Sequence, residues 1–320
     1  MKPTSPVALV AGLLWLACSH FAFAGTGFAT RDLNPVLQPY FLPSHIPTRA
    51  DNGWRIDHSL FITNTFQQKT TSNEDLIIDV ENYRYELGMT YRRDQWQALV
   101  KLPFIANSAG SLDGLIGDWH DFFGLPEGRR DKFPADQLKI EYTLDGVVEY
   151  SQTRSSSGLG DTVVALGYQS VGGTVYFAGI ELPTGSAADF SGNEAVDFAL
   201  WLSREVAIDT EMTVFGMFGI SFPGDDGNLE GLIADHIWVA QLGLGYRFND
   251  YLAGTVQLDM HSKTVERSDL KPFGNSLQVQ LGLGFLKLID NHRLDLFFSE
   301  DIAVGTAPDI SFGLRLAREF

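Results

Sequence analysis

The sequence has almost no cysteine. Its single Cys18 lies in the apolar stretch at the start of the chain, so a chain without that stretch can form no disulfide. No later run of about 18 apolar residues occurs, which excludes membrane-spanning helices of the usual kind. The sequence also shows no zinc spacing of His and Cys, no complete calcium loop and no glycine-rich phosphate loop before a helix. It therefore implies neither a metal nor a cofactor.

Positive charge is scarce as well. The chain carries 23 Lys and Arg against 40 Asp and Glu, for a formal net charge of −17. A nucleic-acid partner needs a basic face for its phosphates, so this balance excludes nucleic acid. An acidic excess suits divalent cations at a lipopolysaccharide surface, but solubility explains it equally well.

Residues 1–24 are typical of a cleaved secretory signal peptide. Lys2 gives the positive start, Val7 to Leu16 form the apolar core, and Ala22-Phe23-Ala24 form the cleavage site. We therefore expect an exported protein. Lipidation at Cys18 is an alternative that the sequence leaves open.

Residues 25–52 follow as an irregular segment. Four prolines prevent regular structure in it: Pro35, Pro39, Pro43 and Pro47. The segment is too apolar for a free tail, because it also contains Leu33, Val36, Leu37, Tyr40 and Phe41. We expect it to lie in the periplasm and to pack on the periplasmic mouth of the domain that follows.

From residue 53 to 320, apolar and polar side chains alternate in runs typical of strands with one apolar and one polar face. Twelve such runs can be counted when a hairpin in a long insertion is left out. The connections between the runs alternate between short and long. The short ones lie near 92–95, 170–173, 203–211, 249–250 and 287–292, and the long ones near 67–75, 106–160, 183–194, 223–234, 263–274 and 300–308.

Strands that cross a lipid bilayer must form a closed barrel, because only a closed barrel satisfies every backbone hydrogen-bonding group. An even strand number, short periplasmic turns and longer outer loops are the pattern of outer-membrane proteins. We therefore predict an all-β fold over residues 53–320. It is an antiparallel transmembrane β-barrel of about 12 strands, with both termini in the periplasm.

The insertion over 106–160 interrupts this pattern. Apolar residues recur at nearly helical spacing over 115–123, which predicts a short helix. Asp145-Gly146 between two alternating runs predicts a hairpin. The candidate site of the insertion is Trp119, His120 and Asp121, although a helix that simply docks on the barrel explains them too. The insertion is long enough to be either an extracellular loop or a plug.

The last run, from Asp309 to Phe320, ends the chain on an aromatic residue. One face of this run is apolar and carries Ile310, Phe312, Leu314 and Leu316. The run resembles the C-terminal sorting signal of bacterial outer-membrane barrels, which closes on a residue such as Phe320. Arg318 departs from that signal, which usually has an apolar residue there. The resemblance implies recognition by the barrel-assembly machinery through this strand.

Five further blocks stand out in the sequence. They are Gly117–Pro126, Ser157–Asp161, Glu181–Gly185, Asp197–Ser203, and Ser299–Val304 with Thr306–Asp309. Together they resemble the domain of unknown function 3187 family of Gram-negative bacteria, over most of the chain from Asn34 onward. The resemblance implies an envelope protein of about this length, and it implies no established activity.

If the apolar face of each strand meets lipid, the polar face lines the lumen. The candidate lumen residues carry both signs of charge: Arg55, Asp57, Arg84, Glu86, Lys101, Glu181, Asp197, Gln241, Arg247, Gln257, Asp259, His261, Arg293, Asp295 and Arg315. Such residues either line a polar pore or form a salt-bridged filling, and twelve strands lie between filled small barrels and open porins. We interpret the chain as a narrow or plugged channel for an unknown small solute. We expect a monomer in contact with outer-membrane lipids and lipopolysaccharide.

Two alternatives belong to other classes of protein. A non-conducting structural or surface-interaction protein of the envelope would carry its function on its loops. An outer-membrane lipid hydrolase would need a serine within hydrogen-bond reach of a histidine. The pairs His58-Ser59 and His261-Ser262 are strand neighbours, so their side chains point to opposite faces. His261 and Asp259 share a face, but no serine with a recognisable motif accompanies them, and we expect no enzyme.

Overall fold

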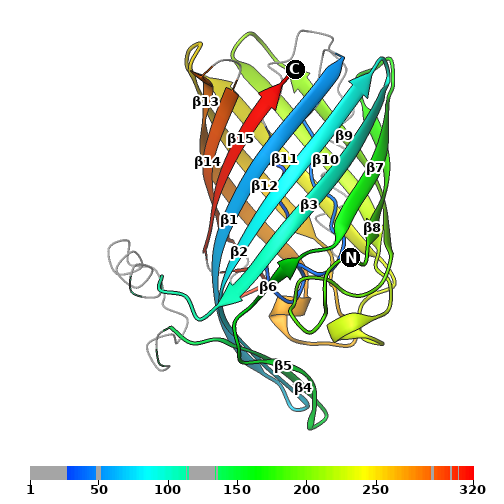
Figure 1. Ribbon diagram of the computed structural model, residues 1–320, viewed down its shortest axis with the longest axis vertical. Helices are drawn as coiled ribbons and strands as arrows, with labels where there is room; N and C mark the ends of the chain where they lie inside the picture. The colour runs from blue at the N-terminus through cyan, green and yellow to red at the C-terminus, as the bar shows by residue number, and fades with distance from the viewer. Residues whose placement is uncertain are drawn as a thin grey trace, which may run out of the picture.

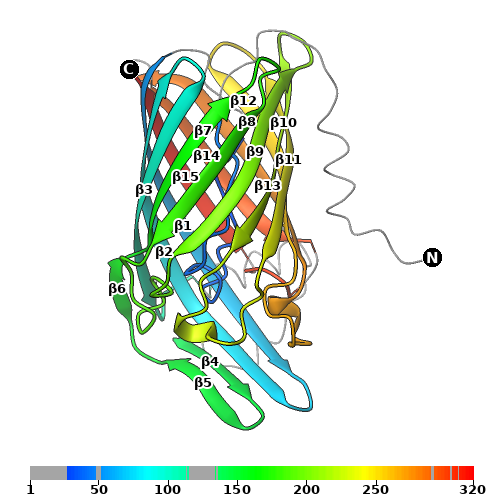
Figure 2. The same ribbon diagram turned by 90° about the vertical axis from the view of Figure 1, so that its right-hand side faces the viewer.

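The predicted antiparallel barrel of twelve strands is confirmed (Figures 1 and 2). The structure, a computed structural model, describes residues 27–47, 52–112, 114, 134, 136–289, 292–302, 305–308 and 310–320. The barrel strands, in the order in which they pair, are β1 (Gly53–Thr70), β2 (Glu74–Arg93), β3 (Trp96–Ser108), β7 (Thr162–Gln169), β8 (Val175–Leu182), β9 (Asp197–Ala207), β10 (Met212–Phe222), β11 (Ile237–Arg247), β12 (Leu252–His261), β13 (Ser276–Ile289), β14 (His292–Asp301) and β15 (Ile310–Glu319). Two short 3-10 helices, η2 (Gly227–Leu229) and η3 (Lys271–Phe273), lie in the loops. Among the described residues, no helix is long and apolar enough to cross a membrane.

The first and last strands close the barrel. β1 pairs with β15 from Arg55 opposite Glu319 to Asn64 opposite Ile310, and Phe320 N–H donates to Trp54 O at 2.9 Å. The amphipathic C-terminal run is therefore the closing strand. Its polar face points into the lumen, where Arg315 is buried, and its apolar face points outward, where Leu314 is exposed.

The outer surface carries two bands of exposed aromatic side chains. The band at the end of the barrel that holds the C-terminus includes Trp54, Tyr91, Trp96, Tyr168 and Tyr246, and the band at the other end includes Phe104, Phe198, Phe222 and Trp238. Between the bands the outward side chains are aliphatic, for example Leu200, Val256 and Leu283. Aromatic girdles on both sides of an apolar belt are the surface that a β-barrel presents to a bilayer.

One end of the barrel continues beyond the lipid-facing belt. The prediction of a long connection over 67–75 is wrong. β1 extends to Thr70 and β2 begins at Glu74, so most of these residues belong to strands. Residues 67–71 are polar on both faces of the strand, so the sequence lacks the alternation of apolar and polar residues that predicts a strand. The insertion supplies β4 (Lys139–Leu144), which pairs with the outer part of β2, and β5 (Val147–Gln152), which pairs with β4. The resulting extension lies at the bottom of Figure 1, opposite the C-terminus.

The predicted hairpin of the insertion joins β4 and β5. Asp145 and Gly146 form its turn with φ values of 50° and 80°, as a two-residue hairpin requires. A short strand, β6 (Ser156–Leu159), then pairs with the end of β3. The predicted helix over 115–123 and the candidates Trp119, His120 and Asp121 lie outside the described residues. The signal peptide expected over 1–24 does so as well.

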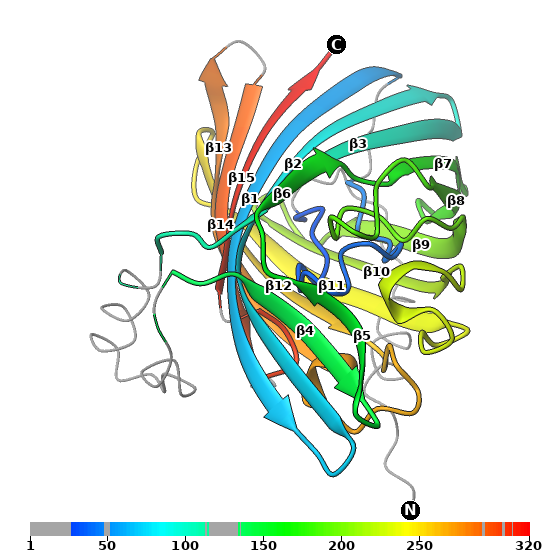
Figure 3. The same cartoon turned by 60° about the horizontal axis from the view of Figure 1, so that its bottom comes forward.

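The N-terminal segment lies inside the barrel. We expected it at the periplasmic mouth, and for residues 27–47 that prediction is wrong. Figure 3, which looks in from the end opposite the C-terminus, shows this segment in blue within the ring of strands. Almost every one of its residues is buried, including Phe28, Leu37 and His45. We call residues 27–47 the plug.

Two of the blocks that resemble the family meet at the rim of the barrel opposite the C-terminus. Asp161, in the first, accepts hydrogen bonds from the N–H groups of Gly185 at 2.7 Å and Asn193 at 2.9 Å. The Thr184 hydroxyl of the second block donates to Gly160 O at 2.7 Å. Burial raises the pKa of the Asp161 carboxyl, so these N–H donors only partly offset the cost of burying its charge. The two blocks thus fold the loop over 183–194 onto the rim.

Replacing Asp161 with alanine should loosen this loop. The substitution removes the acceptor of two loop amides, and each net hydrogen bond contributes about 1 kcal/mol. Two such bonds amount to about 2 kcal/mol, so we expect proteolytic cleavage within 183–194 to become about thirtyfold faster, since about 1.4 kcal/mol corresponds to a factor of ten. Limited proteolysis followed by mass spectrometry measures the rate. An unchanged rate would show that the carboxylate does not hold the loop.

Candidate functional site

The plug consists of two limbs joined by a turn. Asn34 O accepts the amides of Leu37 and Gln38, both at 2.9 Å, which forms the turn. Arg31 braces the two limbs, because its guanidinium donates to Gln38 O at 2.5 Å and to Tyr40 O at 2.8 Å. The turn lies toward the loops at the end opposite the C-terminus, where the Leu229 amide of η2 donates to the Tyr40 hydroxyl at 3.1 Å.

Side chains of the wall hold the backbone of the plug. Gln241 reaches both limbs, since its Nε2 donates to Thr30 O at 2.7 Å and its Oε1 accepts the His45 amide. The Phe28 amide donates to Gln257 Oε1 at 2.9 Å. Among the described residues, no backbone group of the plug pairs with a backbone group of the wall. The plug is therefore fastened by individual polar contacts and not by a strand ladder.

Half of the lumen wall is apolar. The inward side chains of β3 and of β7 to β11 form one cluster with the returning limb of the plug: Phe41, Leu42, Ile46, Leu99, Val163, Ala165, Val175, Phe177, Ala199, Trp201, Met217, Ile237 and Val239. Trp201 stacks on Phe177 with ring centroids 4.9 Å apart, and Phe41 meets its edge at 5.9 Å. The sequence analysis identified only the polar residues of the lumen, and this apolar set lies beside them on the inward faces of the same strands.

The other half of the wall is polar, and it contacts the first limb of the plug. The Thr30 hydroxyl lies 2.8 Å from Asp259 Oδ2 and 2.6 Å from Gln280 Oε1. Asp32 Oδ2 lies 2.9 Å from His261 Nε2. The apolar half contributes one polar contact to the returning limb, where His45 Nε2 lies 3.0 Å from Oε1 of Glu205 in β9, with both side chains fully buried.

A charged belt lies nearer the C-terminal end of the barrel. Asp295 of β14 accepts from Arg293 Nε at 2.7 Å and from Arg315 Nη2 of β15 at 2.7 Å. Arg55 of β1 makes a bidentate contact with Asp57, in which Nε donates to Oδ2 at 2.9 Å and Nη2 donates to Oδ1 at 2.7 Å. Pairing of this kind is how a lumen can hold charge at low cost.

The structure places the predicted lumen residues as follows. The buried ones, on the inward faces of their strands, are Arg55, Arg84, Glu86, Glu181, Asp197, Gln241, Gln257, Asp259, His261, Asp295 and Arg315. The half-buried ones are Asp57, Lys101, Arg293 and Arg247, and Arg247 lies at the end of β11, 3.9 Å from Asp250 in the turn. Phe320 is exposed beneath the Arg318 guanidinium, 4.5 Å from its ring centroid. That these residues line a conducting path stays a prediction.

The geometry of His261 disfavours the hydrolase alternative. Nε2 of its ring contacts Asp32, and Nδ1 lies 2.8 Å from the backbone oxygen of Ser262. Both ring nitrogens are therefore occupied, and neither is left to accept a proton from a serine nucleophile. Within the described ranges, no group of three or more His, Cys, Asp and Glu residues is placed to hold a metal ion.

The cavities that the described residues leave between the plug and the wall are small. Three of them leave about 30, 20 and 30 Å³ open to the centre of a water molecule. A bound water needs about 10–15 Å³ by this measure, so each cavity holds one to three waters. The lumen is closed to solutes at these levels while the plug is in place.

The comparison with protein families gives one match. The family model described as "Protein of unknown function (DUF3187)" matches residues 6–320. No match is found among curated proteins.

Solved outer-membrane barrels have a similar fold. The COG4313 outer membrane channel from Pseudomonas putida F1 matches with a TM-score of 0.54 at 12% identity, over 85% of this chain and 97% of that chain. The translocator domain of autotransporter NalP from Neisseria meningitidis matches with 0.47 at 10%, over 85% and 90%. The CymD monoaromatic hydrocarbon channel matches with 0.44 at 10%, over 92% and 94%. Only the first likeness is strong enough to compare folds, and it places this fold among outer-membrane β-barrels.

Proposed function

This chain belongs to the DUF3187 family, and from the geometry of its lumen we propose that it is a narrow outer-membrane channel for small solutes, closed by its own plug. The two aromatic bands and the apolar belt between them support insertion in the outer membrane. The tight connections lie at the end that holds the C-terminus, and short turns on the periplasmic side are usual in outer-membrane barrels, which supports a periplasmic position for that end.

The observation that carries the proposal is how the lumen is closed. Twelve strands enclose more space than the side chains of the wall fill by themselves. The remaining space is taken by the plug, which is held through side chains such as Gln241 and Asp197. The plug can therefore leave without breaking a single barrel hydrogen bond between strands. A barrel with a purely structural role would not need a plug that can leave the lumen.

Cross-linking the plug to the wall tests this proposal. Thr30 and Gln280 are in contact at 2.6 Å, and the chain beyond residue 24 contains no cysteine. We expect the Thr30→Cys, Gln280→Cys double variant to conduct in planar bilayers before treatment. A short thiol-specific bifunctional reagent should then abolish the conductance, and reduction of the cross-link should restore it.

Single variants serve as controls for this experiment. Thr30→Cys and Gln280→Cys, each treated alone with the same reagent, should keep their conductance because no bridge can form. Equal conductance with and without the cross-link would show that ions do not need the plug to move. A complete lack of conductance in every form would favour the non-conducting envelope protein, with its function on the β4–β5 extension.

A further inference from the structure

The first limb of the plug meets β12 at two contacts that lie two residues apart on the strand. Thr30 of the plug contacts Asp259, and Asp32 of the plug contacts His261. All four side chains are buried, with exposed fractions of 3 to 4%. Buried polar groups are nearly always paired within the protein, so the hydrogens available to each contact can be counted.

The contact of Thr30 is one hydrogen short when Asp259 is ionised. The Thr30 hydroxyl lies 2.8 Å from Asp259 Oδ2 and 2.6 Å from Gln280 Oε1, and the Gln280 amide nitrogen also contacts Asp259 Oδ2. The hydroxyl has a single hydrogen, so it can donate to only one of its two oxygen neighbours. Turning the Gln280 amide over gives the hydroxyl a donor but sets two oxygens against each other at Asp259. A proton on Asp259 completes all three contacts.

The contact of Asp32 is one hydrogen short when its histidine is neutral. His261 Nε2 lies 2.9 Å from Asp32 Oδ2, and Nδ1 lies 2.8 Å from the backbone oxygen of Ser262. Carboxylate and carbonyl oxygens only accept hydrogen bonds, whereas a neutral imidazole carries one N–H. The pair therefore completes both contacts only with a further proton, either as an imidazolium beside a carboxylate or as a neutral ring beside a carboxylic acid.

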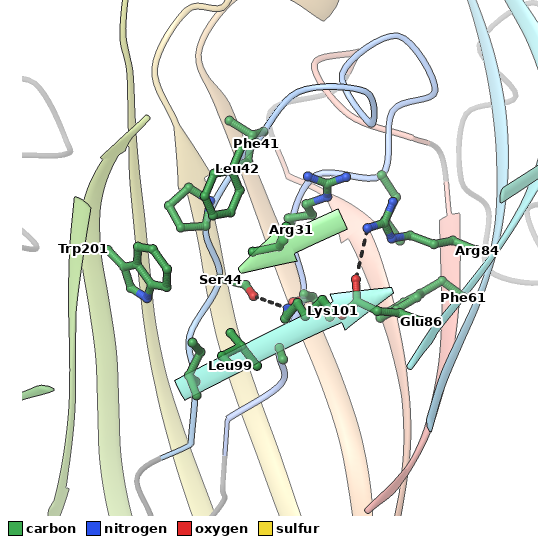
Figure 4. A pocket seen from close by; sticks show the side chains of 16 residues that line it. Arg31, Phe41, Leu42, Ser44, Phe61, Arg84, Glu86, Leu99, Lys101 and Trp201 are labelled. Atoms are coloured by element: carbon green, nitrogen blue, oxygen red, sulfur yellow. Dashed lines mark hydrogen bonds and ion pairs between the residues drawn. The ribbon is translucent and has the colours of Figure 1, made fainter. Parts of the chain in front are cut away.

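Apart from the His261 pair, the side chains that face Asp259 from the wall are uncharged. They are Gln241 of β11, Gln257 of β12, and Gln278 and Gln280 of β13. Arg31, the single arginine of the plug, borders the same small cavity, but its guanidinium is held by two carbonyl oxygens of the plug. Figure 4 shows Arg31 in the neighbouring cavity, which Arg84 and Glu86 also line. Within the described ranges no cation forms an ion pair with Asp259, so nothing there balances an ionised carboxylate.

His261 has a second charged group near its ring. Opposite it in the wall stand Val239 of β11 and Ser276 of β13, which are both uncharged. Asp301, the last residue of β14, lies close to the ring, and its carboxylate accepts the Gly305 amide at 2.7 Å. Its negative charge favours a proton on the His261 pair. Both contacts of the first limb thus depend on protons and not on a fixed cation.

The contact of the returning limb needs no such proton. His45 Nε2 faces Glu205 Oε1 at 3.0 Å, while His45 Nδ1 has no hydrogen-bond partner among the described residues. A neutral imidazole supplies the one hydrogen that this contact requires. The two limbs of the plug therefore differ in how they respond to pH.

We propose that two protons, one on Asp259 and one shared by Asp32 and His261, hold the plug in the lumen and release it as the pH rises. The inference rests on the proposed channel function and adds its regulation. A displaced plug exposes both sites to water, where carboxyl groups are ionised and imidazole is mostly neutral above about pH 7. The closed state then binds up to two protons more than the open state. Its stabilisation is complete in acid and is lost as the pH rises.

Trypsin measures release of the plug without any need for conductance. Arg31 is the only Lys or Arg in residues 27–47, so cleavage after it reports a plug that has left the lumen. The folded protein in detergent is treated from about pH 6 to about pH 9, and mass spectrometry follows the cleavage. A synthetic peptide of residues 27–47, cleaved in parallel, corrects for the pH dependence of the protease itself.

The corrected cleavage rate should rise steeply with pH. It follows the ratio of released to seated plug when the plug returns faster than trypsin cleaves. Two protons lost on release give a rise of up to about a hundredfold per pH unit.

Two amide variants replace the titrating protons by permanent N–H groups. Asp259→Asn and Asp32→Asn each supply the missing hydrogen at every pH, so each should lower the rise to about tenfold per pH unit. The double variant should be cleaved slowly at every pH. Asp32 follows the cleaved bond, so its variants are corrected with a peptide that carries the same substitution. Glu205→Gln is the matched control on the returning limb and should keep the full pH dependence.

The possible outcomes separate this inference from the channel function. A corrected rate that does not change with pH, or that rises equally in the Asp259→Asn variant, overturns the inference even if the protein conducts. Cleavage at no pH overturns it as well, because the plug then stays in place. A rise that the double variant abolishes and Glu205→Gln keeps supports the two protons even if planar bilayers stay silent. In that case the channel function fails and the plug keeps its response to pH.

Discussion

Replacing Asp197 with alanine should open the lumen. Asp197 is fully buried at the start of β9, and its carboxylate accepts from the Phe41 amide of the plug at 2.7 Å. The same carboxylate accepts from Asn193 Nδ2 at 2.7 Å and from the Gly224 amide at 2.8 Å. It therefore ties two outer loops and the plug to one point of the wall. Alanine leaves the plug amide without its acceptor at a cost of about 1–3 kcal/mol.

The size of the effect follows from that cost. The cost falls on the closed state alone, because a displaced plug has its amide in water. A change of about 1.4 kcal/mol raises the ratio of open to closed channels about tenfold. Single-channel recording in planar bilayers measures this ratio. We expect longer and more frequent openings of the Asp197→Ala variant, at an unchanged unit conductance or a larger one.

Asp161→Ala is the matched control for this prediction. Asp161 holds the same loop through the amides of Gly185 and Asn193 but makes no hydrogen bond to the plug. Its replacement should loosen the loop over 183–194 without raising the open probability. If both variants open the channel equally, the loop and not the Phe41 contact controls access to the lumen.

The barrel was predictable because alternation of apolar and polar residues repeats in most of its strands. A period of two is fixed by the pleat, and one face of each strand has to be apolar where it meets lipid. The closing run illustrates this, since Phe312, Leu314 and Leu316 keep the period to the end of the chain. The loop blocks were recognised only as resemblances. Their hydrogen bonds, such as those of Asp161, became evident in the fold because they join segments more than 20 residues apart in the sequence.

The plug was not predictable in its position. Its prolines exclude any periodic pattern, so that its partners cannot be derived from spacing. Those partners lie far along the chain, since Thr30 contacts Gln280 across 250 residues and His45 contacts Glu205 across 160. The apolar residues of the segment showed that it packs on something. The sequence analysis did not identify three plug residues that contact the wall, Thr30, Asp32 and His45. These are polar residues in an apolar segment that packs on other parts of the chain, and a buried polar side chain requires a partner.

The apolar half of the lumen could not be predicted from the sequence, because its strands carry large apolar residues on both faces. In β8, Tyr176 points outward and Phe177 inward, and in β9 Leu200 points outward and Trp201 inward. Alternation in hydrophobicity disappears when both faces are apolar, so the inward set cannot be identified from the pattern. In the polar half, the contrast between Leu296 and Asp295 leaves no such ambiguity.

Asp295→Ala should cause the largest loss of stability that a single lumen substitution produces. Asp295 is fully buried and is the shared partner of Arg293 and Arg315, which it contacts at 2.7 Å each. Its removal leaves buried guanidinium charge without its carboxylate, which costs about 3–5 kcal/mol. We expect the free energy of unfolding in urea, measured in detergent, to fall by about that amount. The control is Asp250→Ala, because Asp250 is 73% exposed in its pair with Arg247 and its loss should change the free energy by at most about 1 kcal/mol.

Adding Arg315→Leu to Asp295→Ala tests whether the charged belt is dry or hydrated. An unpaired buried charge is the source of the cost, so removing Arg315 as well should recover part of the lost free energy. Recovery would mean that the belt is dry and that its charges are tolerated only as a set. A loss with Asp295→Ala no larger than the loss with Asp250→Ala would mean that water reaches the belt and screens it. In that case Arg293 and Arg315 border a hydrated path between the plug and the end of the barrel that holds the C-terminus, and charge reversal at Arg315 should then change the ion selectivity of the open channel.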